Sequence, residues 1–79
     1  MTHETVPHPV VARLARELAA IRVSQGWTQS GIARHMGIAQ SAAYRVEHGT
    51  FHRWLPAINY ADALGYDLVI TVVPKNGDE

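Results

Sequence analysis

Apolar side chains recur every three or four residues in the first part of the chain, the spacing of one face of a helix. They are Val11, Leu14, Leu18 and Ile21. Pro9 suits the first turn of such a helix, because the amide hydrogen it lacks has no partner there. The pattern predicts a helix from Pro9 to about Gln25 with its apolar stripe in the core.

Between Gly26 and Gly49 the spacing predicts two more helices joined by a sharp turn. The Thr28 hydroxyl can cap the first of them, and Trp27 can fold over Ile32 beside that cap. Gly37 can adopt the left-handed backbone conformation that a reversal needs. The positions that two crossing helices would bury are Ile32, Ala33, Met36, Ile38, Ala43 and Val46.

The second of these helices, from about Gln40 to His48, keeps one polar face. Its members are Gln40, Ser41, Tyr44, Arg45 and His48. A solvated surface is one interpretation of such a face. The other is base recognition, because Gln and Arg form bidentate hydrogen bonds with adenine and guanine edges, and a helix fits the major groove of DNA. The preceding turn favours the second interpretation.

After the turn motif, a fourth helix is predicted from about Trp54 to Leu64, with Pro56 in its first turn and Gly65 at its end. Its predicted inward side chains are Trp54, Ile58, Ala61 and Leu64.

The segment from Tyr66 to Val73 is rich in β-branched residues and predicts a strand that stops at Pro74. A lone strand leaves its amides and carbonyls unpaired, so we expect it to pair with the same strand of a second copy. Leu68, Ile70 and Val72 would then cover the helices. The alternative is an extended tail packed on its own helices. The predicted dimerisation residues are Tyr66, Leu68, Val69, Ile70, Thr71, Val72 and Val73.

Length and composition indicate one small domain of 79 residues with no cysteine and a formal net charge of zero. We expect a flexible N-terminus at 1–8, the domain at 9–73 and a flexible tail at 74–79. From Thr28 to Arg53 there are three arginines and one glutamate, so the motif is the basic part. No apolar run is long enough for a signal peptide or a membrane helix. We therefore expect a cytoplasmic protein that binds no membrane.

The stretch from Gly26 to Gly49, with the preceding IRVSQ and the following FHRWLPAINYADALG, resembles the Xre and lambdoid-repressor family of helix-turn-helix DNA-binding proteins. The WTQS, QS and E-x-G positions, together with Ala33 and Gly37, carry the resemblance. It implies a mainly α, four- to five-helix, lambda-repressor-like domain. With the predicted strand, it implies a dimer that binds double-stranded DNA at a palindromic operator and acts as a transcriptional repressor.

The resemblance also implies roles for individual residues. Gln29 would bond to a phosphate and brace Gln40, while the Thr50 backbone would contact phosphate and Arg53 the minor groove. Arg22 and Glu47 would form a structural ion pair. The residues implied to face bases or phosphates are Gln29, Gln40, Ser41, Tyr44, Arg45, His48, Thr50 and Arg53. Ala39 departs from the family, because a Ser or Thr cap often occupies that place.

Two other classes of function remain open. The chain also resembles HipB-type antitoxins, through GWTQS and through a strand after the fourth helix. A toxin or another protein is therefore an alternative partner. A catalytic site is not expected, since no nucleophile or carboxylate pair has a scaffold. His48 and His52 have zinc spacing, but no further ligand is evident. We therefore expect no cofactor and no metal.

Overall fold

The computed structural model describes residues 7–75 and contains four helices. They are α1 (Pro9–Ser24), α2 (Gln29–Met36), α3 (Gln40–Glu47) and α4 (Trp54–Ala63). All four predicted helices are present, and their ends agree within one residue. The ends predicted to be flexible, 1–8 and 74–79, lie mostly outside the described residues.

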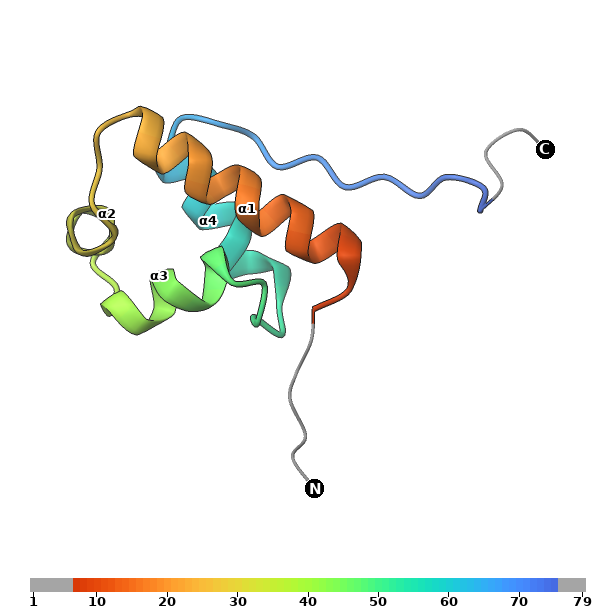
Figure 1. The fold of residues 1–79 in the computed structure, drawn as a ribbon, viewed down its shortest axis with the longest axis horizontal. Helices are drawn as coiled ribbons and strands as arrows, with labels where there is room; N and C mark the ends of the chain where they lie inside the picture. The colour runs from red at the N-terminus through yellow and green to blue at the C-terminus, as the bar shows by residue number, and fades with distance from the viewer. Residues whose placement is uncertain (1–6, 76–79) are drawn as a thin grey trace, which may run out of the picture.

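The third helix lies at the centre of the arrangement, because α3 contacts α1, α2 and α4. Figure 1 looks along α2, whereas α1 and α3 lie across the view. The helix-turn-helix pair therefore consists of two short crossed helices held against α1 and α4 mainly through α3.

Local sequence signals set the ends of α2. The Thr28 hydroxyl accepts a hydrogen bond of 2.9 Å from the Gly31 amide, as expected for an N-cap. Gly37 ends the helix with a φ of 72°, and the Ile38 amide closes the turn on the Ala33 carbonyl at 3.0 Å. The turn between α2 and α3 is thus built as predicted. By contrast, Ala39 supplies no side-chain cap for α3.

The core joins all four helices around α3. Its buried members are Leu18, Ile32, Ala33, Ala43, Val46, Ala57, Tyr60, Ala61 and Leu64, with Leu14, Ile21, Trp27, Met36 and Ile38 packed against them. These residues include the apolar positions predicted for the turn motif. Trp27 packs on this core, and its ring centroid lies 5.1 Å from that of His35.

The predicted inward face of α4 is partly wrong. Ala61 and Leu64 are buried as expected, but Trp54 and Ile58 are 39% and 40% exposed. Ala57 and Tyr60 lie in the core instead. Pro56 lies in the first turn of α4, as expected. The helix is therefore rotated relative to the prediction, and the aromatic side chain that α4 buries in the core is Tyr60.

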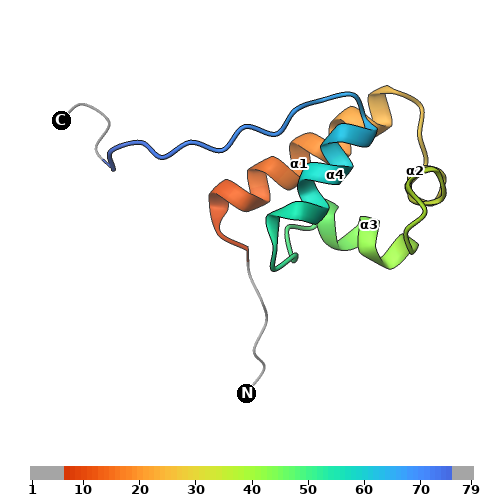
Figure 2. The ribbon, with the colours of Figure 1, turned by 180° about the vertical axis from the view of Figure 1, so that it is seen from behind.

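The segment after α4 is extended, but no strand forms within residues 7–75 of the single chain. It leaves the end of α4 and extends beyond the body of the four helices (Figure 1 and Figure 2). Leu68 packs against the core, whereas Ile70 and Val72 are 52% and 98% exposed. In the single chain Leu68 alone of these three side chains covers the helices, and the arrangement expected for the paired strand stays a prediction.

Candidate nucleic-acid interface

The outward face of α3 gathers the polar side chains predicted to read bases. Gln40, Ser41, Tyr44 and Arg45 are all exposed. Together with Gln29 of α2 they line one shallow, open depression of 450 Å³. The two helices of the turn motif thus present a single polar surface.

This surface continues toward the loop that follows α3. Arg45 also lines a second depression of 250 Å³, which Thr50 and Arg53 share. We call the combined surface the recognition strip, formed by Gln29, Gln40, Ser41, Tyr44, Arg45, His48, Thr50 and Arg53. The structure brings these predicted residues together from two helices and one loop.

Tyr44 and His48 stack within the recognition strip. Their ring centroids are 3.7 Å apart with planes inclined by 16°, and His48 Nδ1 lies 2.9 Å from the Tyr44 carbonyl oxygen. A carbonyl can only accept, so Nδ1 carries the hydrogen. A neutral His48 then offers only an acceptor at Nε2, and donation to a phosphate requires the charged ring. The spacing of four residues along a helix was the available signal for this stack.

The predicted phosphate contact from the Thr50 backbone needs correction. The Thr50 amide already donates to the Arg45 carbonyl at 3.0 Å, where it closes the end of α3. The Thr50 hydroxyl also donates to this oxygen, at 3.4 Å. Both donors of Thr50 are thus bonded to the Arg45 carbonyl in the free protein, and the longer hydroxyl bond is the one that a phosphate oxygen can replace more easily.

Behind the strip, Arg22 of α1 and Glu47 of α3 form an ion pair. Arg22 Nε lies 2.6 Å from Glu47 Oε2, and Nη2 lies 3.2 Å from Oε1. The Tyr60 hydroxyl of α4 also donates to Glu47 Oε2. Hydrophobicity patterns did not indicate this tyrosine, because its burial depends on a carboxylate 13 residues away.

The charge states of this cluster follow from its hydrogen bonds. Burial alone would raise the pKa of Glu47, but the bonds from Arg22, Tyr60 and Gln29 outweigh burial and lower it. The hydrogen bond with Glu47 raises the pKa of Arg22. Burial, followed by the bond with Glu47, raises the pKa of Tyr60 well above its ordinary range. At neutral pH the cluster therefore holds an ionised pair and a neutral phenol.

Gln29 connects this cluster to the recognition strip. Its Nε2 donates to Glu47 Oε1 at 3.2 Å, and its Oε1 accepts from Gln40 Nε2 at 3.4 Å. Gln29 is half-buried, whereas Gln40 is exposed. The contact expected between the two glutamines is present, and it leaves the outer side of Gln40 facing solvent.

Burial of Glu47 changes the charge balance at the surface. Glu47 is the acidic residue of the stretch from Thr28 to Arg53, and its side chain is only 5% exposed and paired with Arg22. Arg34, Arg45 and Arg53 of the same stretch are exposed. The stretch from Thr28 to Arg53 therefore exposes three positive charges and no negative one, although the formal net charge of the whole protein is zero.

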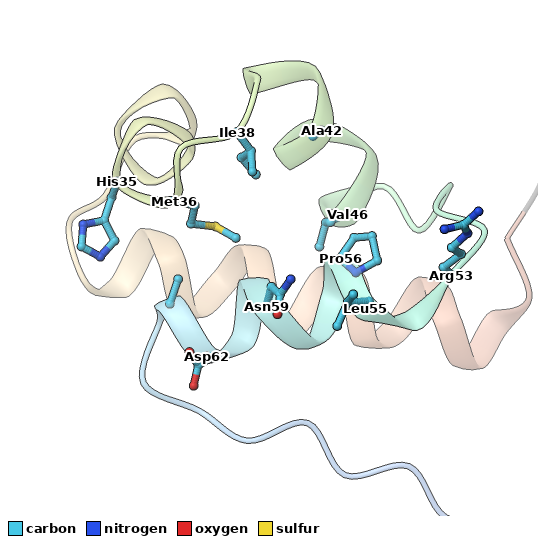
Figure 3. A pocket seen from close by; sticks show the side chains of 11 residues that line it. His35, Met36, Ile38, Ala42, Val46, Arg53, Leu55, Pro56, Asn59 and Asp62 are labelled. Carbon is cyan, nitrogen blue, oxygen red and sulfur yellow. The ribbon is translucent and has the colours of Figure 1, made fainter.

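A separate open groove of 590 Å³ lies between α2, α3 and α4. Figure 3 shows His35 at one end, Arg53 at the other, and apolar side chains such as Met36 and Ile38 between them. The groove uses Ala42 and Val46 of α3, on a different face from the depression beside Gln40. Arg53 thus borders both this groove and the strip.

Within residues 7–75, no three potential metal ligands lie together, and no helix is long and apolar enough to cross a membrane.

Crossed helices α2 and α3, their left-handed glycine turn and the exposed polar face of α3 define a helix-turn-helix fold. The chain is similar to the crystal structure of the restriction-modification controller protein C.AhdI from Aeromonas hydrophila, with a TM-score of 0.66 and 24% identity. The match covers 76% of this chain and 92% of that chain. The predicted resemblance to Xre-type helix-turn-helix proteins is confirmed at the level of the fold. No protein-family model matches the chain. No curated protein matches it either.

Proposed function

We propose that this protein is a sequence-specific DNA-binding regulator of transcription that works by binding, without catalysis, in the cytoplasm. The observation that carries the proposal is the recognition strip. It combines exposed groups able to bond to base edges, such as Gln40 and Arg45, with a further exposed arginine, Arg53, at its edge. The likeness to C.AhdI, described as a controller protein, supports a regulatory role.

In this proposal α3 enters the major groove. Gln40, Ser41, Tyr44 and Arg45 face base edges, while Gln29, His48 and the Thr50 hydroxyl contact phosphates. Arg53, at the edge of the strip, reaches the adjacent minor groove. Bound protein represses transcription because it occupies DNA that polymerase would otherwise use.

The bound form in this proposal is a homodimer joined by the segment from Tyr66 to Val73. The segment is already extended in the single chain, and Val69, Val72 and Val73 are 79%, 98% and 71% exposed. Antiparallel pairing with a second copy would satisfy its backbone and cover these side chains. Two recognition helices then bind an inverted repeat whose half-sites lie about 34 Å apart.

The same exposed apolar segment favours a second candidate function. A toxin or another protein could add its own strand to this edge, which would make the chain an antitoxin or an interaction module. In that case the recognition strip would be an ordinary solvated surface.

Selection of random duplex DNA on the purified protein tests the proposal, with the mass in solution measured alongside. We expect an enriched inverted repeat bound by a dimer. Replacing Gln40, Ser41 and Arg45 together by Ala should abolish the enrichment and leave the dimer mass unchanged. Absence of enrichment with the folded wild-type dimer would favour the interaction module.

A further inference from the structure

A continuous chain of hydrogen bonds runs from the core of the protein to the recognition strip. It begins at the Tyr60 hydroxyl, passes through the Glu47 carboxylate and the Gln29 amide, and ends at Gln40. Tyr60 is 0% exposed, whereas Gln40 lies on the outer face of α3. A buried side chain of α4 is thus linked to a side chain placed to read a base.

All acceptor positions of the Glu47 carboxylate are occupied by hydrogen bonds. Oε2 accepts from Arg22 Nε and from Tyr60, and Oε1 accepts from Arg22 Nη2 and from Gln29 Nε2. A carboxylate offers about four acceptor positions, so four donors hold it in one rotation. Loss of the Tyr60 hydroxyl would free one position on Oε2 and permit the carboxylate to turn.

The orientation of Glu47 dictates that of both glutamines. An ionised carboxylate only accepts, so the amide nitrogen of Gln29 must face it and the carbonyl oxygen of Gln29 must face Gln40. Gln40 then uses one N–H on Gln29. Its carbonyl oxygen and its second N–H remain for the partner, which is the donor and acceptor pair that adenine requires.

We propose that Tyr60 is a positioning residue for base recognition, which orients the Gln40 amide through Glu47 and Gln29. The proposal rests on the proposed DNA-binding function. It assigns a specificity role to a side chain that does not touch DNA, and it predicts that removing one buried hydroxyl weakens the preference for one base.

The experiment compares the wild type with Tyr60→Phe, which keeps the ring and removes the hydroxyl. In selections of random DNA, we expect one base position in each half-site to lose preference by about three- to tenfold, with the others unchanged. The affected position should be the one that changes in Gln40→Ala. Gln29→Met, which keeps the length but removes the amide, should relax the same position. It provides a second variant if Tyr60→Phe fails to fold.

A second experiment, without DNA, tests the hydrogen-bond relay itself, that is, the chain of bonds from Tyr60 through Glu47 and Gln29 to Gln40. In ¹⁵N spectra of the free protein, the side-chain amide signals of Gln29 and Gln40 should both move in Tyr60→Phe. The matched control is Ser24→Ala, which removes an exposed hydroxyl that donates to the Ile21 carbonyl at the end of α1. In that variant neither amide signal should move, and base preference should stay that of the wild type.

Three results would overturn the proposal. Unchanged side-chain amide signals of Gln29 and Gln40 in Tyr60→Phe would show that the Tyr60 hydroxyl does not orient these glutamines. A uniform loss of affinity for all sequences would indicate a merely structural tyrosine. A wild-type protein that enriches no sequence would overturn the proposed function and, with it, the specificity role, even if the amide signals move.

Discussion

Arg22 and Glu47 join α1 to α3 through two hydrogen bonds, with 2.6 Å between Nε and Oε2 and 3.2 Å between Nη2 and Oε1. Arg22 also donates to the Trp27 carbonyl at 2.8 Å. One guanidinium therefore ties the first helix, the loop that follows it and the recognition helix together. Together with the buried Ala43 and Val46, this pair fixes the orientation of α3.

Replacing Arg22 by Ala should lower the free energy of unfolding by about 3 kcal/mol, because it leaves a buried carboxylate without its charge partner. Urea unfolding measures the loss. Arg13→Ala is the matched control, since Arg13 and Glu17 form an exposed pair separated by 3.9 Å, and its loss should stay below about 0.5 kcal/mol. Equal effects of the two substitutions would contradict a structural role for the Arg22 pair.

Stability should fall at acid pH through Glu47. Its folded-state pKa lies below the ordinary value of 4.5, so the unfolded chain takes up the proton first as the pH falls. The contribution of Glu47 is complete above about pH 4.5 and disappears as the pH falls through the folded-state pKa. Urea unfolding from pH 7 to pH 3 should therefore show a difference between wild type and Glu47→Gln that shrinks on acidification. A difference constant with pH would contradict this assignment.

Adding a cap to α3 should stabilise the protein. Ala39 has the extended backbone of an N-cap, with φ −68° and ψ 148°, but offers no side-chain acceptor. Ala39→Ser should gain about 1 kcal/mol, which corresponds to a rise in Tm of about 4 to 8 °C. Thermal unfolding measures it. Ala20→Ser, at an exposed position inside α1, is the control and should give a small loss. A loss at both positions would refute the capping argument.

The turn motif could be predicted from the sequence because its signals are local. Thr28 caps the helix that begins next to it, and Gly37 adopts the conformation that its missing Cβ permits. The register of α4 could not be predicted in the same way. Trp54 and Ile58 are as apolar as the residues that replace them in the core, and the buried hydroxyl of Tyr60 has its partner in Glu47, on a different helix.

In the candidate site, too, the features set by local sequence could be predicted and those set by tertiary structure could not. Helical spacing was enough to place Gln40, Ser41, Tyr44 and Arg45 on one exposed face of α3. It did not indicate that the Thr50 amide is consumed at the helix end, since that bond depends on how the chain leaves α3. The strand predicted at 66–73 needs a second backbone, so the fold of one chain does not contain it.

Arg53 should contribute to binding mainly through charge. It is exposed at the edge of the recognition strip, so Arg53→Ala should weaken binding whichever bases α3 contacts. The plot of log affinity against log salt should become shallower by about one per protomer, or about two for a dimer. Fluorescence anisotropy at several salt concentrations measures the slope. Lys75→Ala, beyond Pro74 and outside the strip, should leave the slope unchanged, and an unchanged slope in Arg53→Ala would remove Arg53 from the interface.

Val72→Asp should separate association from folding. Val72 is 98% exposed in the single chain, so a charge there costs the monomer little. In an antiparallel pair across a two-fold axis it would meet the partner strand, and association should weaken by on the order of tenfold or more through desolvation and repulsion. Sedimentation equilibrium measures association, and urea unfolding checks the monomer. Val23→Asp is the matched control, because Val23 is an apolar residue of α1, 62% exposed and outside the segment. If Val72→Asp leaves the dimer intact, the segment from Tyr66 to Val73 does not join the two copies.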